Sequence, residues 1–579
     1  MTMLTKWGAA LDRSCPLPEY PRPQLRRESF YNLNGVWDYA VTPSGDEPEV
    51  WDGEIVVPFS PEAPLSGAAR GPAKDEYLHY RRGFTLPEGF QKSRVLLHFG
   101  AVDQIAEAFV NGVSAAKHSG GYWPFSADIT SLLREGENIL RVTVRDNADD
   151  PTFAYGKQRY KRGGMWYTAQ SGIWQTVWLE SVPEVYVKSL RITPEFDEAR
   201  VRIELETALE SSAAITCDVR AADGSFVAGS WAKGGVCVVP LPGFRAWSPD
   251  DPYLYTLDIT CGEDHVESYF AMRKFSYVEL DGHKVFGLNN APLFHNGLLD
   301  QGYYPDGLLT PPSDEAMVND IETMKRCGFN MLRKHIKIEP LRWYYHCDRL
   351  GMIVWQDMVS GGQPYSFLHV SALPTLGKVD LPDQDAKPYG RSGVLSRARF
   401  RREMADTVRL LYNCPCIALW TVFNEGWGQF DALDMANELK KLDPTRFIDH
   451  ASGWQDQGYE EMKSRHIYFR PVKLKNDGRA LALTEYGGYI LAVDGHRWTD
   501  KVFGYRICRD SAALAHDYEK LMLGQVLPHI RKEGLTAAVY TQITDVEEEL
   551  NGLMTYDREV LKIPEETLRE INAALRFDA

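Results

Sequence analysis

Residues 417–426 read IALWTVFNEG, and residues 481–487 read LALTEYG. Each stretch is a short apolar run of the kind that forms a buried strand, and each carries a glutamate at or near its carboxyl end. A carboxylate in that setting is costly to bury without a purpose, so two of them suggest a pair that faces a common pocket. A carboxylate pair is also the minimal apparatus for breaking a glycosidic bond. Glu425 and Glu485 are therefore the first candidates for catalytic residues.

The chain around these glutamates predicts a barrel. From about residue 276 onward, helical segments separate short apolar strands; the first helix begins at Ser313 and stops at Gly328. Further helices are expected near 340–351, 394–412, 430–441 and 510–532. The strand candidates are Phe294–Asp300, Asn330–His335, Met352–Asp357, Ile417–Phe423, Phe447–Ser452, His466–Arg470, Leu481–Gly487 and Ala537–Gln542. Eight strands that mostly alternate with helices match a (β/α)8 TIM barrel over residues 276–579.

Two β-rich segments precede the barrel. Residues 1–181 contain short alternating runs punctuated by Gly, Pro and Asn, which predicts a jelly-roll β-sandwich. Residues 182–275 alternate cleanly, and their size and strand rhythm fit an immunoglobulin-like β-sandwich. We therefore expect three domains, with boundaries near residues 181 and 275.

Composition narrows the class of partner. The 579 residues include 64 basic and 80 acidic side chains, a net charge of −16, which argues against nucleic acid or an anionic membrane as a partner. There is no apolar run long enough for a membrane span, and the first residues contain no apolar signal segment. The 9 scattered cysteines fit no disulfide framework, so a cytoplasmic protein is expected. Sandwich domains with exposed aromatic residues are compatible with a homo-oligomer.

In a TIM barrel the active site lies at the carboxyl ends of the strands. Glu425 would follow the fourth strand and Glu485 would lie in the seventh, so both would point toward the mouth. A separation of roughly 5 Å would make the enzyme retaining, with one group as nucleophile and the other as acid/base.

Neighbouring residues suggest how the two roles are supported. Trp427 could exclude water and so raise the pKa of an acid/base. Tyr486 or Tyr468 could donate a hydrogen bond that keeps a nucleophile ionised. Asn424 would be placed to hydrogen-bond the 2-hydroxyl of a sugar, a contact that strengthens in the transition state.

Together these features resemble glycoside hydrolase family 2, which includes β-galactosidases, β-glucuronidases and β-mannosidases. Beyond the two glutamate motifs, the resemblance rests on NLNGVW, YRRGF, SGIWQ and NCPCI, at residues 32–37, 80–84, 171–175 and 413–417. It covers the whole chain, and it implies that Glu425 is the acid/base and Glu485 the nucleophile. It also implies further substrate-binding candidates: His335, His466, Asp306, Lys334, Asp357 and Tyr540. Either histidine could instead be a satisfied core residue, Asp306 a turn residue and Lys334 a solvated one.

One stretch departs from the family members that act on glucuronides. Those members hold the substrate carboxylate with an Asn-x-Lys just before a Gly, but residues 547–552 here read EEELNG. Asn551 stands at the lysine position and three acids precede it, so the site would repel a uronate unless another basic group substitutes. The run KQRYKR at residues 157–162 is the obvious basic patch. If this loop reaches the barrel mouth, it could bind an acidic or extended glycan. The alternative is a solvated loop.

These observations predict a retaining exo-β-glycosidase that acts on an oligosaccharide or glycoside, with β-galactoside as the first choice of substrate. The alternatives within the fold are β-glucuronide, β-mannoside, β-galactofuranoside and α-L-arabinoside. A non-catalytic carbohydrate-binding protein is the alternative of another class, and the presence of both glutamates argues against it. The metal-dependent arrangement of some long β-galactosidases is not visible in the sequence, so we expect no cofactor and no required metal.

Overall fold

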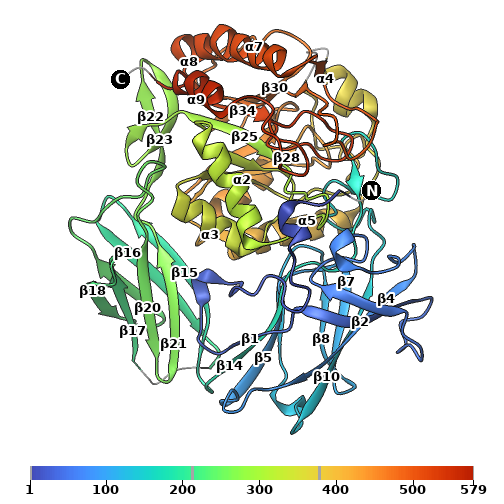
Figure 1. Cartoon of the computed structure of the whole chain (residues 1–579). Helices are drawn as coiled ribbons and strands as arrows, with labels where there is room; N and C mark the ends of the chain where they lie inside the picture. Colours follow the sequence, from blue (N-terminus) through green and yellow to red (C-terminus); the bar gives the residue numbers. More distant parts are fainter. Residues whose placement is uncertain (1–2, 210–213, 376–379, 578–579) are drawn as a thin grey trace.

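The chain folds into two β-sandwiches that lie side by side beneath a barrel, as Figure 1 shows. The structure is a computed structural model and describes residues 3–209, 214–375 and 380–577. Among the helices in these ranges, none is both long and apolar enough to cross a membrane.

The first sandwich packs a four-stranded sheet, in the order β1-β14-β5-β9, against a six-stranded sheet, in the order β3-β2-β4-β10-β7-β8. Its core contains Trp37, Leu97 and Val142, whose side chains are almost completely buried. The expected domain boundary near residue 181 stays a prediction. The strands are β1 (Phe30–Asn32), β2 (Gly35–Thr42), β3 (Gly53–Val57), β4 (Tyr77–Thr85), β5 (Arg94–Phe99), β7 (Ile105–Val110), β8 (Val113–Ser119), β9 (Phe125–Asp128), β10 (Glu137–Arg145) and β14 (Val177–Val182).

Short strand pairs and short helices surround this sandwich and connect it to the barrel. Two short pairs join β6 (Val102–Asp103) to β13 (Gly172–Ile173) and β11 (Gln158–Arg159) to β12 (Tyr167–Thr168). The short helices are α1 (Lys6–Ala9), η1 (Pro23–Leu25), η2 (Pro64–Ser66) and η3 (Thr130–Leu132).

The second sandwich is smaller and packs sheet β15-β16-β19 against sheet β18-β17-β20-β21. Val201, Val219 and Leu257 form part of its core. They lie on the inner faces of strands along which buried and half-buried residues alternate. A separate three-stranded sheet, β22-β23-β24, leads into the barrel. The strands are β15 (Val187–Glu195), β16 (Arg200–Thr207), β17 (Ile215–Arg220), β18 (Phe226–Trp231), β19 (Val236–Pro240), β20 (Tyr255–Cys261), β21 (Asp264–Phe270), β22 (Phe275–Leu280), β23 (His283–Leu288) and β24 (Ala291–Pro292).

The barrel is an eight-stranded parallel sheet in the order β29-β28-β27-β26-β25-β34-β31-β30, which confirms the expected TIM barrel. Its two end strands lie side by side, where the hydroxyl of Ser464 donates to the carbonyl oxygen of Ala451 at 3.0 Å. The strands are β25 (His295–Asp300), β26 (Met331–Lys334), β27 (Ile353–Asp357), β28 (Ile417–Asn424), β29 (Phe447–Ser452), β30 (Met462–Ile467), β31 (Ala480–Gly487) and β34 (Leu535–Thr541). A short pair, β32 (Tyr489–Ile490) and β33 (Arg506–Ile507), lies outside the ring.

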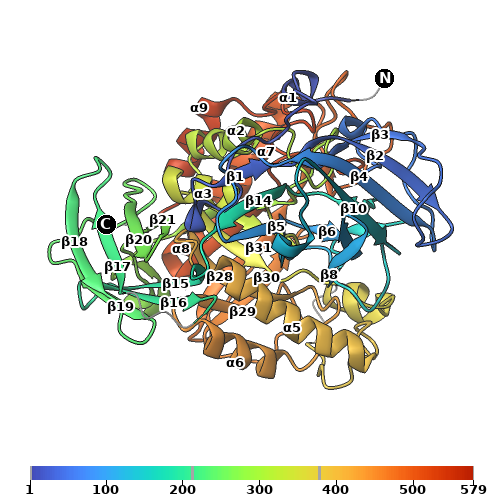
Figure 2. The same cartoon turned by 90° about the horizontal axis from the view of Figure 1, so that it is seen from below.

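The expected helices form on the outside of the ring. Ser313 caps the first of them, because its hydroxyl accepts from the amide of Ala316. Figure 2 shows α5 and α6 packed outside the strands that they connect. The helices are α2 (Asp314–Arg326), α3 (Leu341–Leu350), η4 (Leu368–Ala372), α4 (Leu373–Thr375), α5 (Val394–Leu411), α6 (Ala432–Leu442), α7 (Ser511–Leu521), η5 (Met522–Val526), α8 (Leu527–Glu533) and α9 (Glu565–Ala573).

One strand prediction is wrong in its bounds. The sixth barrel strand spans Met462–Ile467 rather than His466–Arg470. Lys463 and Arg465 are half-buried and hide the apolar signal of this strand, although it buries the residues between them. The correction places His466 near the carboxyl end of the strand, at the mouth of the barrel.

Candidate active site

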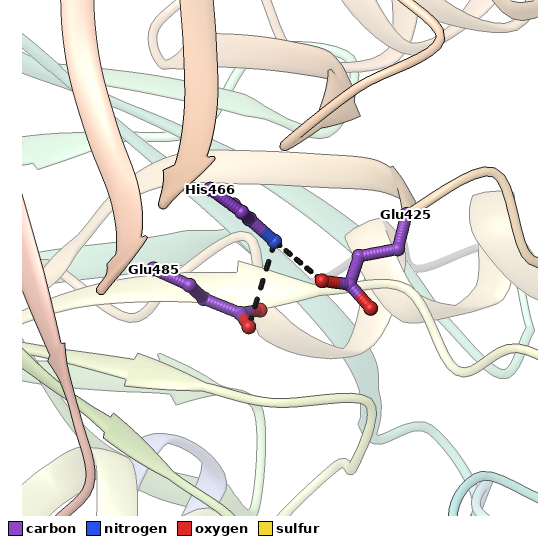
Figure 3. Close-up of side chains that lie close together, drawn as sticks. All are labelled: Glu425, His466 and Glu485. Atoms are coloured by element: carbon purple, nitrogen blue, oxygen red, sulfur yellow. Dashed lines mark hydrogen bonds and ion pairs between the residues drawn. The ribbon is translucent and has the colours of Figure 1, made fainter. Parts of the chain in front are cut away.

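Glu425 and Glu485 face each other across the barrel mouth, with His466 between them (Figure 3). Glu425 follows β28, and Glu485 lies in β31. Nδ1 of His466 lies 2.8 Å from Oε1 of Glu425 and 3.5 Å from Oε2 of Glu485. One carboxylate oxygen of each glutamate and an imidazole nitrogen all lie within 4.8 Å of one another. Carboxyl groups of retaining glycosidases are held about 5 Å apart.

The backbone holds Glu425 in an unusual conformation. Its φ angle is +53°, in the left-handed region that non-glycine residues rarely occupy. Its amide donates to the carbonyl oxygen of Ser452, and its own carbonyl accepts from Nε1 of Trp454, both at 2.9 Å. These bonds to the next strand and its loop fix the turn and aim the side chain into the mouth. Burial raises the pKa of Glu425, which suits a general acid.

Glu485 receives two hydrogen bonds from donors. Nη1 of Arg333 donates to Oε1 at 3.1 Å, and the Tyr468 hydroxyl donates to Oε2 at 2.6 Å. Donors of this kind stabilise the charged carboxylate that a nucleophile requires. Of the two expected tyrosines, Tyr468 makes this bond.

Arg333 is a site residue that the sequence reasoning missed. It is fully buried, pairs with Asp357 through Nε and Nη2 at 3.0 Å each, and donates from Nη2 to Oδ1 of Asn424 at 2.8 Å. It thereby orients Asn424, Asp357 and Glu485 together. The missing signal was the two-residue period of the strand, which puts Arg333 on the same face as His335 and Lys334 on the other.

His335 and Asp357 form a second pair in the site. Nδ1 of His335 lies 2.7 Å from Oδ2 of Asp357. Burial lowers the pKa of His335, while for Asp357 burial is outweighed by Arg333 and His335, which lower its pKa to about 2. A neutral imidazole beside an ionised carboxylate donates from Nδ1, which leaves Nε2 as an acceptor.

The hydrogen-bond network assigns the opposite tautomer to His466. The hydroxyl of Thr484 donates to the carbonyl oxygen of Arg465 at 3.4 Å, and the hydroxyl of Ser452 donates to Oγ1 of Thr484 at 3.0 Å. Ser452 therefore accepts, at 3.2 Å, from Nε2 of His466. Burial lowers the pKa of His466 to about 3, so the ring is neutral and its Nδ1 is an acceptor. The proton in the 2.8 Å contact with Glu425 then belongs to Glu425.

A loop of the first sandwich reaches the barrel mouth and buries the start of the basic run, while residues 160–162 stay exposed. Ala154 pairs with Gly361, and the amide of Gly156 donates to the carbonyl oxygen of Ser360 at 2.9 Å. Lys157, the next residue, is only 9% exposed, and its charge acts on Glu425 and His335.

The same loop covers the acidic run that precedes Asn551. Arg162 lies 3.6 Å from Glu547, and the amide of Gly164 donates to Glu548 at 2.9 Å. Glu549 is buried and accepts from the Tyr167 hydroxyl. Burial raises the pKa of Glu549, and the charge of Glu485 adds to this shift.

Aromatic rings of this loop enclose Trp427. The ring of Trp427 lies 5.0 Å from that of Trp166 and 5.8 Å from that of Tyr155, and Arg159 stacks over both loop rings. Trp427 is 5% exposed, so the cluster excludes water behind the turn that carries Glu425.

Asp306 and Lys334 are not brought into this group. Asp306 accepts from the amide and the hydroxyl of Thr5, both at 2.7 Å, and so anchors the N-terminal segment. Lys334 points out of the barrel, where it pairs with Asp300 at 2.6 Å and Glu339 at 2.8 Å.

Two tyrosines of the strand ends also point outward. Tyr486 donates to Sδ of Met522 at 3.1 Å. Tyr540 packs against Tyr486 and Tyr518 between the barrel and its outer helices. Both residues stabilise the packing of strands on helices and do not face the glutamates.

Comparison with protein families finds three matches in chain order. Residues 64–183 match the glycosyl hydrolases family 2 sugar binding domain, residues 185–273 match glycosyl hydrolases family 2, and residues 310–474 match the glycosyl hydrolases family 2 TIM barrel domain. Together these matches follow the order of sandwich, sandwich and barrel.

Curated relatives include two kinds of named enzyme. The β-galactosidase of Halalkalibacterium halodurans is 23% identical over 78% of this chain and 45% of its own length, and that of Thermoanaerobacter pseudethanolicus is 24% identical over 63% and 47%. The human β-glucuronidase is 22% identical over 78% of this chain and 73% of its own length. The chain thus spans about half the length of these β-galactosidases.

Solved structures share the fold over nearly the whole chain. A β-glucuronidase from an uncultured Clostridium species has a TM-score of 0.74 at 19% identity, with 95% of this chain and 98% of that chain covered. A β-galacturonidase from Eisenbergiella tayi, bound to galacturonate, has a TM-score of 0.72 at 19% identity, with 96% and 99% covered.

Proposed function

Because the chain belongs to glycoside hydrolase family 2, we propose that it is a retaining exo-β-glycosidase whose first substrate is a β-galactoside. The observation that carries the proposal is the spacing of Glu425 and Glu485. One carboxylate oxygen of Glu425 lies within 4.8 Å of one carboxylate oxygen of Glu485. Inverting enzymes keep their carboxyl groups roughly 6.5–9.5 Å apart to make room for a water molecule.

The surroundings of the two glutamates support different roles for them, nucleophile for Glu485 and acid/base for Glu425. Glu485, held by Arg333 and Tyr468, attacks the anomeric carbon while Glu425 gives its proton to the leaving oxygen. The glycosyl–Glu485 ester is then hydrolysed by a water molecule whose proton Glu425 accepts. Asn424, oriented by Arg333, is in position to hydrogen-bond the 2-hydroxyl in both steps.

The charges around the pocket support a neutral sugar. Glu549 lies near Glu485, so three glutamates surround the space that the sugar would occupy. A carboxylate and a neutral imidazole both accept hydrogen bonds from sugar hydroxyls, whereas the negative charge of Glu485, with the acidic Glu549 near it, disfavours a uronate. The curated β-galactosidases among the relatives support galactose as the first choice.

Lys157 favours a second candidate, a β-uronidase acting on a glucuronide or galacturonide. Its side chain is almost fully buried, it acts electrostatically on both Glu425 and Glu549, and it makes no ion pair within the described ranges. A buried ammonium without a carboxylate partner is costly, and a substrate carboxylate would offset that cost. The similar folds include enzymes named for uronides.

Turnover of a panel of nitrophenyl glycosides tests both candidates. The panel contains β-galactoside, β-glucuronide, β-galacturonide, β-mannoside, β-galactofuranoside and α-L-arabinoside, each assayed with wild type, Glu485→Gln and Lys157→Gln. Galactoside turnover that Glu485→Gln abolishes supports the first proposal. Uronide turnover that Lys157→Gln also abolishes supports the second. A wild type without turnover on any sugar, but with retained sugar binding, would support a carbohydrate-binding protein instead.

A further inference from the structure

A cavity of about 590 Å³ opens beside Glu425, and neither Arg333 nor Asp357 is among its lining residues. Glu425, His466 and Tyr468 form its inner end. Its outer wall comes from five separate segments of the chain. The apolar side chains of that wall are Met165, Phe367, Trp454, Phe469, Phe503 and Tyr505.

The aromatic residues present carbon surfaces to this cavity. Nε1 of Trp454 donates to the carbonyl oxygens of Val370 and Glu425, both at 2.9 Å, so its polar atom is already used. The ring of Tyr505 stacks on that of Tyr468 at 3.8 Å and meets that of Phe469 edge-on at 5.1 Å. Tyr505 thus links the ring of Phe469 to Tyr468, which donates to Glu485.

Two phenylalanines at the cavity are unusually exposed. The side chain of Phe367 is 72% exposed and that of Phe469 is 71% exposed, although they come from different loops of the barrel. Large apolar side chains gathered around a functional cavity mark a surface that a ligand covers. Among the lining residues that the structure describes, Ser371 and the exposed Arg470 add polar side chains to the outer wall, beside the hydroxyl of Tyr505.

We infer that this cavity binds the leaving group, and that the preferred substrate carries an apolar aromatic aglycone rather than a second sugar. The inference rests on the proposed glycosidase function, because it assumes that Glu425 protonates the oxygen between the sugar and the cavity. A second sugar would bring several hydroxyls that need hydrogen-bond partners, and the outer wall offers few. An aromatic alcohol would bury its surface against the exposed phenylalanines.

The test compares two glycosides of the sugar that the panel identifies, one of methanol and one of 2-naphthylmethanol. The two alcohols are similar in acidity, so a difference in kcat/KM reports contacts with the leaving group rather than its chemistry. We expect the naphthylmethyl glycoside to be preferred by about 100-fold. Phe469→Ser and Phe367→Ser should each reduce that preference by about tenfold.

Phe226→Ser is the matched control, because Phe226 is 60% exposed on β18 of the second sandwich, away from the cavity. It should leave the preference unchanged. Equal kcat/KM for the two glycosides, or a disaccharide of the same sugar preferred over both, would overturn the inference while the glycosidase function stands. Absence of turnover of either glycoside would overturn the proposed function itself, and the aglycone role with it.

Discussion

Nδ1 of His466 lies 2.8 Å from Oε1 of Glu425 and 3.5 Å from Oε2 of Glu485. The chain of hydroxyls through Ser452 and Thr484 places the imidazole proton on Nε2, at the far side of the ring. Glu425 is therefore the donor in this contact and rests in its protonated form. The proposed role of Glu425 as general acid requires that form, so we propose that His466 positions the acid.

This relationship predicts a pH effect in Ser452→Ala. Without the hydroxyl that accepts from Nε2, the neutral ring of His466 can carry its proton on Nδ1 and donate to an ionised Glu425, which lowers the pKa of Glu425. The acid acts only while protonated, so the alkaline limb of the kcat/KM profile moves to lower pH. One hydrogen bond of about 1 kcal/mol corresponds to a shift of roughly 0.7 pH units. Thr484→Ser keeps the hydroxyl and should keep the limb; an unmoved limb in Ser452→Ala would contradict the assigned tautomer.

Glu425→Ala should affect substrates according to their leaving groups. An alkyl glycoside needs protonation of its leaving oxygen, so its kcat/KM should fall by about 10²–10⁴-fold. The 2,4-dinitrophenolate group leaves without being protonated. The rate of the first step should therefore fall far less for a 2,4-dinitrophenyl glycoside. Steady-state and pre-steady-state rates for both substrates measure the difference. Glu485→Gln serves as the contrast, since it should lower turnover of both alike; the same loss on both substrates in Glu425→Ala would reverse the assignment of roles.

Arg333→Ala should destabilise the fold as well as abolish activity. Arg333 is fully buried between Asp357 and Glu485, and its removal leaves two buried carboxylates without their cation. Breaking a buried ion pair from one side costs about 3–5 kcal/mol of unfolding free energy. Arg326→Ala is the matched control, since Arg326 is half exposed and pairs with Glu565 on the surface, where the loss is about 0–1 kcal/mol. Urea denaturation of both variants measures the loss of unfolding free energy. Equal losses in the two variants would show that Arg333 is not the cation that holds the buried carboxylates.

Chelation should leave activity unchanged. Glu425, His466 and Glu485 are the one group within the described part of the chain whose side chains have the composition and spacing of a cation site. Two features oppose that use, because the Nδ1 lone pair of His466 already accepts from Glu425 and Arg333 already neutralises Glu485. Turnover after dialysis against EDTA should match that of untreated enzyme. Loss of turnover that added Mg²⁺ restores would show a required metal.

The order of strands and the two glutamates were accessible from local patterns. Apolar runs such as residues 417–423 and 481–483 report burial directly, and a parallel barrel brings all carboxyl ends to one mouth. This is why Glu425, Glu485 and Asn424 could be named without coordinates, whereas His335 was named from the family resemblance. The sixth strand was misplaced because its polar residues, Lys463 and Arg465, conceal its burial pattern.

The sequence by itself determined the fold class, seven of the eight barrel strands and the two glutamates at their ends, because these follow from short-range periodicity. The tertiary structure decided which of those residues face the pocket and which distant segments complete it. Arg333 rather than Lys334 enters the site, Asp306 binds Thr5 instead, and Lys157 arrives from the first sandwich. The strand period already separates Arg333 from Lys334, but the places of Asp306 and Lys157 depend on contacts between segments far apart in the chain, and no local pattern encodes which segments will meet.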